Sequence, residues 1–224
     1  METGHSEEMA LPTIVDLRNK IEGIGHPSLI KVDSSLVATR LWGEMIDQTQ
    51  GDGLERGVVV SVNRSGNTLT SGIFVENTQE DVLGRLYTPL LPHGIRGFLS
   101  GTHSVTMVHT HFMPPEVDHI ETSYFSGTDV GNFASSQFNA LVMLDRGGAH
   151  LLLKKEQAHS TPVNGIEIVD TAFAEAKKRG ENRSRTVRKI MAERLLPYGM
   201  LYYYTPDIAP ASDNGVVFRH SRLP

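Results

Sequence analysis

The chain of 224 residues contains no cysteine. Disulfide bonds, thiolate zinc sites and cysteine nucleophiles are therefore excluded. Any zinc site in this protein has to use histidine, aspartate or glutamate as its ligands. The absence of cysteine leaves the redox compartment open, because such a chain is compatible with oxidising and reducing conditions alike.

Long apolar runs are also missing, so we expect no membrane-spanning segment and no membrane partner. Residues 1–10 are polar and acidic. They lack the basic start and apolar stretch of a signal peptide, which favours a cytoplasmic location. The formal net charge of −5 argues against a general nucleic-acid binder.

Basic residues are concentrated in one stretch, residues 177–189. We interpret this stretch as a helix end followed by a solvated helix face, because cations are favourable near a helix C-terminus. A patch for an acidic partner or for nucleic acid is the alternative, and it is the weaker one because no aromatic residues alternate with the charges.

The length suits one large domain, and the pattern of apolar residues predicts both strands and helices. The expected strands are 57–62, 68–75, 104–109, 140–144, 149–154, 200–204 and 216–219. The expected helices are 11–25, 34–48, 78–91, 126–139, 166–178 and 184–196. This mixture predicts an α/β fold with a central mixed sheet flanked by helices.

Two histidines at the end of one expected strand, His109 and His111, are the first candidates for metal ligands. Residues two apart on a strand point to the same side, so their imidazoles can converge on one point. Asp129, in the first turn of the next helix, supplies a carboxylate where the helix dipole stabilises negative charge. Three such protein ligands leave a fourth zinc position open for water.

Ser126 stands three residues before Asp129, and this spacing has two interpretations. Ser-x-x-Asp at the start of a helix is a capping box, in which the serine closes the helix end. Alternatively, the Ser126 hydroxyl faces the metal and donates a hydrogen bond to the oxyanion that forms when water attacks a carbonyl group.

Taken together, His109, His111, Ser126 and Asp129 resemble the signature of the JAMM (MPN-plus) zinc metalloproteases. The order of expected elements over residues 54–155 is also similar to that family. The resemblance implies a three-layer fold like that of cytidine deaminases. It divides the chain into an N-terminal helical segment packed on the core (1–50), a JAMM/MPN-like catalytic core (51–160) and a C-terminal part completing the same domain (161–224).

The resemblance also implies a Zn²⁺ cofactor and a catalytic glutamate on an upstream strand. Glu55, directly before the strand at 57–62, occupies that place. A carboxylate beside a metal can accept a proton from water and deliver it to a leaving amine. The implied reaction is hydrolysis of a peptide or isopeptide bond in a protein or peptide substrate, including conjugates of ubiquitin-like or sulfur-carrier proteins.

The chain departs from the family pattern in the loop over residues 112–125, which is longer than usual and begins with Phe112 where the family has proline. This loop contains further potential ligands or gating residues, of which His119 is the strongest rival to the three ligands named above. The others are Glu116, Asp118 and Glu121.

Two other functions stay open from the sequence alone. One is an MPN-like binding or scaffold domain without catalysis, although the complete ligand set argues against it. The other is a RadC-like, nucleic-acid-associated protein that uses the basic stretch. The oligomeric state and the natural substrate are not specified by the sequence.

Overall fold

A computed structural model describes ten segments of the chain. They are residues 29–32, 39–63, 68–70, 74–75, 102–112, 124–136, 138–154, 162–180, 183–206 and 216–221. The helices expected at 11–25 and 78–91 lie outside these segments, as does most of the loop that follows Phe112.

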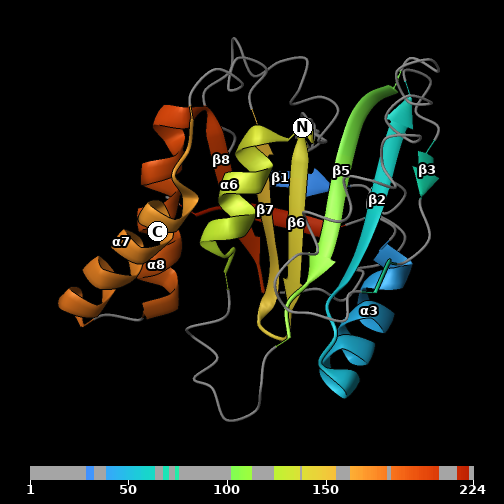
Figure 1. Cartoon of the computed structure of the whole chain (residues 1–224), viewed down its shortest axis with the longest axis horizontal. Coiled ribbons are helices and arrows are strands. Elements are labelled where there is room, and N and C mark those ends of the chain that lie inside the picture. The colour runs from blue at the N-terminus through green and yellow to red at the C-terminus, as the bar shows by residue number, and fades with distance from the viewer. Residues whose placement is uncertain are drawn as a thin grey trace, which may run out of the picture.

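The described part of the chain is built around one nine-stranded mixed sheet with the order β1-β9-β8-β7-β6-β5-β2-β3, in which β4 also pairs with β2 (Figure 1). Only β5 and β6 pair in parallel, and the other described pairs are antiparallel. The strands are β1 (Leu29–Val32), β2 (Arg56–Asn63), β3 (Thr68–Thr70), β4 (Phe74–Val75), β5 (Thr102–Thr110), β6 (Ala140–Asp145), β7 (Gly148–Lys154), β8 (Met200–Thr205) and β9 (Val216–His220).

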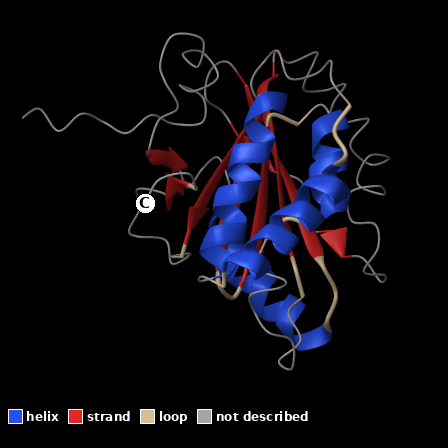
Figure 2. Cartoon of the chain, turned by 90° about the vertical axis from the view of Figure 1, so that its left-hand side faces the viewer, coloured by secondary structure: helices blue, strands red, loops and turns tan. Residues whose placement is uncertain are grey.

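Within the described segments, four α-helices cover the two faces of this sheet: α3 (Thr39–Asp52), α6 (Gly127–Ser135), α7 (Gly165–Arg179) and α8 (Arg183–Leu195), the last followed by the short 3-10 helix η2 (Leu196–Tyr198). One apolar core joins α6, α7 and α8 to one face, and a second core joins α3 to the other. Helices α7 and α8 lie side by side near β8 (Figures 1 and 2). The α/β class expected from the sequence is confirmed.

Strand β1 was not expected from the sequence. Most other elements agree with it, and three further differences have identifiable reasons. Helix α6 ends at Ser135 rather than at 139, because the Ser136 hydroxyl and amide both bind the Phe133 carbonyl oxygen and end the helix. Helix α3 continues through Gly51 and ends before Gly53, which has a φ of 77°. The strand expected at 68–75 is two short strands that both pair with β2.

The parallel neighbours β5 and β6 place the candidate ligands at the C-terminal end of β5, in the middle of the sheet. Helix α6 connects these two strands along the chain. It carries the backbone back across the sheet, so that β6 can run parallel to β5. The end of β5 and the start of α6 therefore lie close together in space. Among the described residues, no helix has the length and apolarity that crossing a membrane requires.

Candidate metal centre

The end of strand β5 and the residue directly after it supply the two histidines, and the alternation of side chains places both on the face covered by α6. His109 pairs with Gly57 of β2 and with Met143 of β6, and His111 follows directly after the strand. The backbone of His111 remains tied to the sheet, because its amide donates to the Leu144 carbonyl oxygen at 3.0 Å. The His109 side chain is 1% exposed and the His111 side chain 14% exposed, so the pair forms a nearly buried site with one accessible edge.

Helix α6 supplies the carboxylate through a complete capping box. The Asp129 amide donates to Ser126 Oγ at 3.0 Å, and the Ser126 amide donates to Asp129 Oδ2 at 2.8 Å. The Ser126 hydroxyl also donates to Asp129 Oδ2 at 2.8 Å. These bonds fix the Asp129 side chain in one orientation, with its oxygens toward the two histidines.

The nitrogen and oxygen atoms of the three side chains are about as far apart as the ligands of a tetrahedrally coordinated cation. The Nε2 atoms of His109 and His111 are 3.2 Å apart, His109 Nε2 is 3.4 Å from Asp129 Oδ1, and His111 Nε2 is 3.1 Å from Asp129 Oδ2. Ligands bound tetrahedrally to zinc at its usual bond lengths stand about 3.3–3.6 Å from one another. These three residues, of which His109 and Asp129 are buried, can therefore hold a metal ion, as their sequence spacing predicted.

The charges within this group show why a cation suits it. Burial disfavours the charged form of His111, but the nearby Asp129 carboxylate outweighs that effect and raises the pKa of His111 to about 9. Burial also opposes ionisation of Asp129, yet the two histidines keep the pKa of Asp129 well below its usual value. Positive charge is thus favoured at the point where the three side chains meet.

Glu55 lies next to this group, although the sequence separates it widely from the histidines. The antiparallel register pairs Gly57 with His109, so continuing it by two residues places Glu55 opposite His111 on the same face. The Phe112 amide donates a hydrogen bond to the Glu55 carboxylate. Burial raises the pKa of Glu55, and the charges of His111 and His109 offset part of this increase. A raised pKa suits a carboxyl group that exchanges protons.

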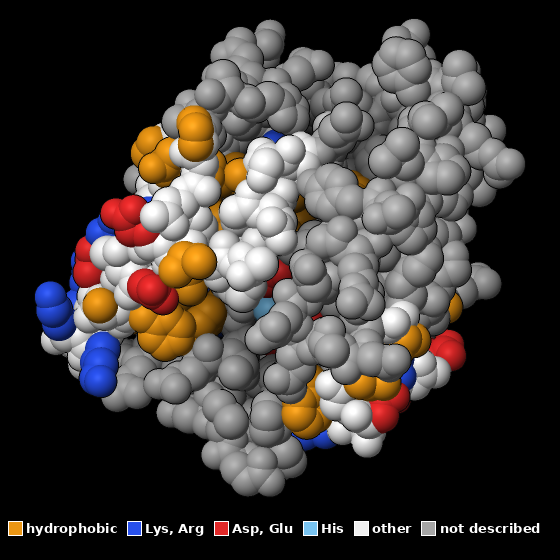
Figure 3. Space-filling view, viewed as in Figure 1, with side chains coloured by type: hydrophobic (Ala, Val, Ile, Leu, Met, Phe, Trp, Pro, Cys, Tyr) orange, Lys and Arg blue, Asp and Glu red, His pale blue; other side chains and the backbone are white. Residues whose placement is uncertain are grey.

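Part of this group reaches the surface. Figure 3 shows histidine and acidic side-chain surface near the middle of the face that it displays, beside the backbone and polar atoms drawn in white. Among the described site residues, Glu55 and His111 are partly exposed and Ser126 is exposed, whereas His109 and Asp129 are buried. Access from solvent is therefore expected on the side of Glu55, His111 and Ser126.

The structure does not bear on every residue that the sequence singled out. The rival ligands of the loop, namely Glu116, Asp118, His119 and Glu121, lie outside the described residues. The basic stretch at 177–189 has partners of its own within the fold. Arg188 stacks 3.8 Å above the Tyr204 ring and donates to Ser184, and Arg179 lies 3.8 Å from Glu175. These contacts favour the structural interpretation of those basic residues.

A second polar group, which sequence reasoning missed, lies on the same face of the sheet. His150 and Asp145 are fully buried, with His150 Nδ1 2.6 Å from the Tyr202 hydroxyl and His150 Nε2 3.6 Å from Asp145 Oδ2. The Phe125 ring separates His150 from His109, its centroid lying 6.2 Å and 6.3 Å from the two imidazoles. The register His109–Met143–His150 across β5, β6 and β7 brings this group to the same face, and the sequence alone does not give that register.

Comparison with known proteins adds no relative from which a function could be transferred. No family model matches the chain, and neither the curated proteins nor the solved structures contain a significant match.

Proposed function

We propose that this protein is a zinc-dependent hydrolase that cleaves a peptide or isopeptide bond. One observation carries the proposal: the side chains of His109, His111 and Asp129 converge, with nitrogen and oxygen atoms 3.1–3.4 Å apart, beside the partly buried carboxyl group of Glu55. The resemblance of these residues to the JAMM/MPN-plus signature supports it, as does the α/β architecture with helices on both faces of the sheet.

His109, His111 and Asp129 are the residues that would hold the zinc ion. When bound, zinc polarises a carbonyl group and lowers the pKa of water to roughly 7. The capping bonds from Ser126 keep the Asp129 carboxylate oriented, and the sheet keeps the two imidazoles in place. The protein thus prearranges the ligands before the metal binds.

Glu55 is the general base and later the general acid of the proposed reaction. Its carboxylate accepts a proton from the attacking water and then delivers that proton to the departing amine nitrogen. The raised pKa of Glu55 supports both transfers, because it makes the carboxylate a better proton acceptor than an ordinary one and brings its pKa closer to neutral pH.

The Ser126 hydroxyl is the proposed donor to the oxyanion of the tetrahedral intermediate. In the structure, the hydroxyl donates its hydrogen bond to Asp129 Oδ2, and so it has to turn toward the substrate when the negative charge develops. The Ser126 amide continues to hold the same carboxylate oxygen, which keeps Asp129 in place while the hydroxyl turns.

Metal content tests the first half of this proposal. Purified protein is expected to contain about one zinc ion per chain, and His109→Ala and Asp129→Ala are expected to lose it. Glu193→Ala is the matched control, because Glu193 is an exposed side chain of α8. Equal metal content in all four proteins would refute the proposed ligand set.

Cleavage tests the second half. Wild-type protein loaded with zinc is to be assayed on fluorogenic peptides and on isopeptides joined through a lysine side chain. Glu55→Gln is expected to keep its zinc and lose cleavage by at least ~10²-fold, because the amide cannot carry the proton. A protein that binds zinc and cleaves neither substrate class would favour the non-catalytic scaffold function instead.

A further inference from the structure

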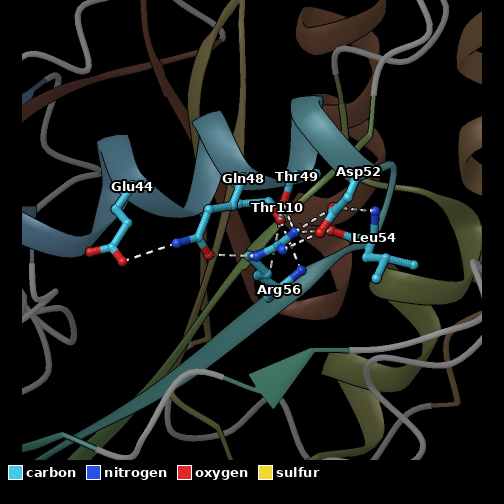
Figure 4. Close-up of polar contacts among 7 residues, drawn as sticks. All are labelled: Glu44, Gln48, Thr49, Asp52, Leu54, Arg56 and Thr110. Carbon is cyan, nitrogen blue, oxygen red and sulfur yellow. Dashed lines mark hydrogen bonds and ion pairs between the residues drawn. The ribbon is translucent and has the colours of Figure 1, made fainter.

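Arg56 is a buried cation that joins the end of α3 to the start of β2 (Figure 4). Its guanidinium group donates to both carboxylate oxygens of Asp52, at 2.9 Å and 2.6 Å, and to the Leu54 carbonyl oxygen at 2.6 Å. It also donates to Gln48 Oε1 at 3.0 Å and to Thr49 Oγ1 at 3.3 Å. Such a fixed fork of donors is particular to arginine.

The same group of bonds reaches the strand that carries the histidines. Thr110 lies between His109 and His111, and its hydroxyl oxygen accepts a hydrogen bond from the Arg56 amide at 2.9 Å. Thr110 Oγ1 is also 2.7 Å from Thr49 Oγ1, which belongs to α3. Because alternate side chains point to opposite faces, this contact forms on the α3 side of the sheet while the two imidazoles point to the other side.

The backbone is therefore held by hydrogen bonds on both sides of Glu55. The Leu54 carbonyl before it is held by the Arg56 guanidinium, and the Arg56 amide after it is held by Thr110. On the strand opposite, the Gln50 amide group donates to the His111 carbonyl oxygen at 3.1 Å, so α3 holds that segment too. Few backbone positions remain free to move the Glu55 carboxylate away from His111.

We propose that Arg56 is a positioning residue that holds the Glu55 carboxylate against the candidate metal centre. Arg56 does not itself contact the ligand atoms and acts through the backbone on either side of Glu55. This inference rests on the proposed function for its catalytic consequence, but its structural consequence is independent of any activity.

The Phe112 amide gives the direct readout, because its hydrogen bond to Glu55 exists only when the carboxylate is in place. In Arg56→Met, residue-resolved amide exchange by NMR of the metal-free protein is expected to be at least ~10-fold faster at Phe112. The core amide of Val142 is expected to keep its protection, which excludes global unfolding. Arg56→Lys is expected to restore only part of the protection, because lysine cannot make the fork.

Kinetics give the second readout. Arg56→Met is expected to keep its zinc and to lower kcat with little change in KM, as a displaced base would. Arg194→Met is the matched control, because Arg194 pairs with Glu175 between α8 and α7, away from Glu55. It is expected to change neither Phe112 exchange nor kcat.

The outcomes separate this inference from the proposed function. Unchanged Phe112 exchange in a folded Arg56→Met protein would overturn the positioning role, whatever the activity. Faster exchange at Phe112 in a protein whose wild type cleaves neither substrate class would support the positioning role and contradict the hydrolase. If Arg56→Met does not fold, Thr49→Val serves the same test, because it removes the hydroxyl that bridges Arg56 and Thr110.

Discussion

Gly127 and Gly165 bring the N-termini of α6 and α7 into direct backbone contact. A Cβ atom on Gly165 would lie closer than 3.0 Å to the Gly127 carbonyl oxygen, and one on Gly127 would meet the Ile166 backbone at 2.5 Å. Gly127 is the first residue of α6, between Ser126 and Asp129. The close approach of these two helices therefore sets the position of the helix end that carries the candidate metal ligand.

Gly165→Ala is expected to destabilise the fold by about 1–3 kcal/mol, because the added methyl group meets backbone that cannot rotate away. It is also expected to shift the start of α6 and weaken zinc binding by ~10-fold, since Asp129 moves with it. Urea unfolding and a competitive zinc titration measure the two effects.

Gly43→Ala is the control for this change. Gly43 lies inside α3, where a Cβ atom would meet nothing within 4 Å. Replacing an unhindered helical glycine by alanine is expected to stabilise the protein by up to about 1 kcal/mol and to leave zinc binding unchanged. Equal effects of the two substitutions would show that the contact between α6 and α7 does not position the site.

Lys154 holds the other end of α6. Its Nζ donates to the Ser136 carbonyl oxygen at 2.6 Å and to the Ala134 carbonyl oxygen at 3.3 Å, and it lies 4.7 Å from the centre of the Phe133 ring. Lys154→Met is expected to cost about 1–3 kcal/mol at neutral pH, because charged hydrogen bonds to the helix end are lost. Chemical denaturation of the two proteins measures this difference.

The pH dependence of the Lys154 effect has a definite sign. Burial lowers the pKa of Lys154 from its ordinary value to about 8, so the folded state binds this proton more weakly than the unfolded state does. The free energy of unfolding is then expected to rise between pH 8 and about 10.5 in wild type, relative to Lys154→Met. A difference that stays flat or falls over this range would show that Lys154 is not desolvated as the structure indicates.

The sequence predicted those parts of the site that depend on local spacing. The alternation of a strand places His109 and His111 on one side, and the capping-box spacing orients Asp129. The position of Glu55 opposite His111 depends on the register between β2 and β5, for which only the family resemblance gave a guide. The buried pair of Asp145 and His150 could not be recognised at all, because neighbouring strands and not the local sequence create it.

Zinc binding is expected to weaken as the pH falls, because protons and the metal compete for the same nitrogen atoms. The Asp129 carboxylate raises the pKa of His111 to about 9 against the burial effect, so at pH 7 the metal has to displace a proton. The increase in melting temperature caused by added zinc is therefore expected to grow from pH 6 to pH 8.

Asp129→Asn is the comparison for this experiment, because the amide removes the negative charge and keeps the shape of the side chain. It is expected to show little thermal stabilisation by zinc at either pH. A wild-type protein whose melting temperature did not respond to zinc at any pH would contradict the metal site.

The buried contact between His150 and Tyr202 is expected to contribute to stability as a coupled pair. Tyr202→Phe removes the hydroxyl that lies 2.6 Å from His150 Nδ1, and His150→Leu removes the imidazole and leaves Asp145 beside an apolar side chain. The single changes are expected to cost about 1 kcal/mol and about 3 kcal/mol, respectively, because each leaves a buried polar group without its neighbour. The double variant is expected to be more stable than the sum predicts by about 1 kcal/mol. Urea unfolding of all four proteins provides the cycle, and strictly additive costs would show that the imidazole and the hydroxyl do not interact.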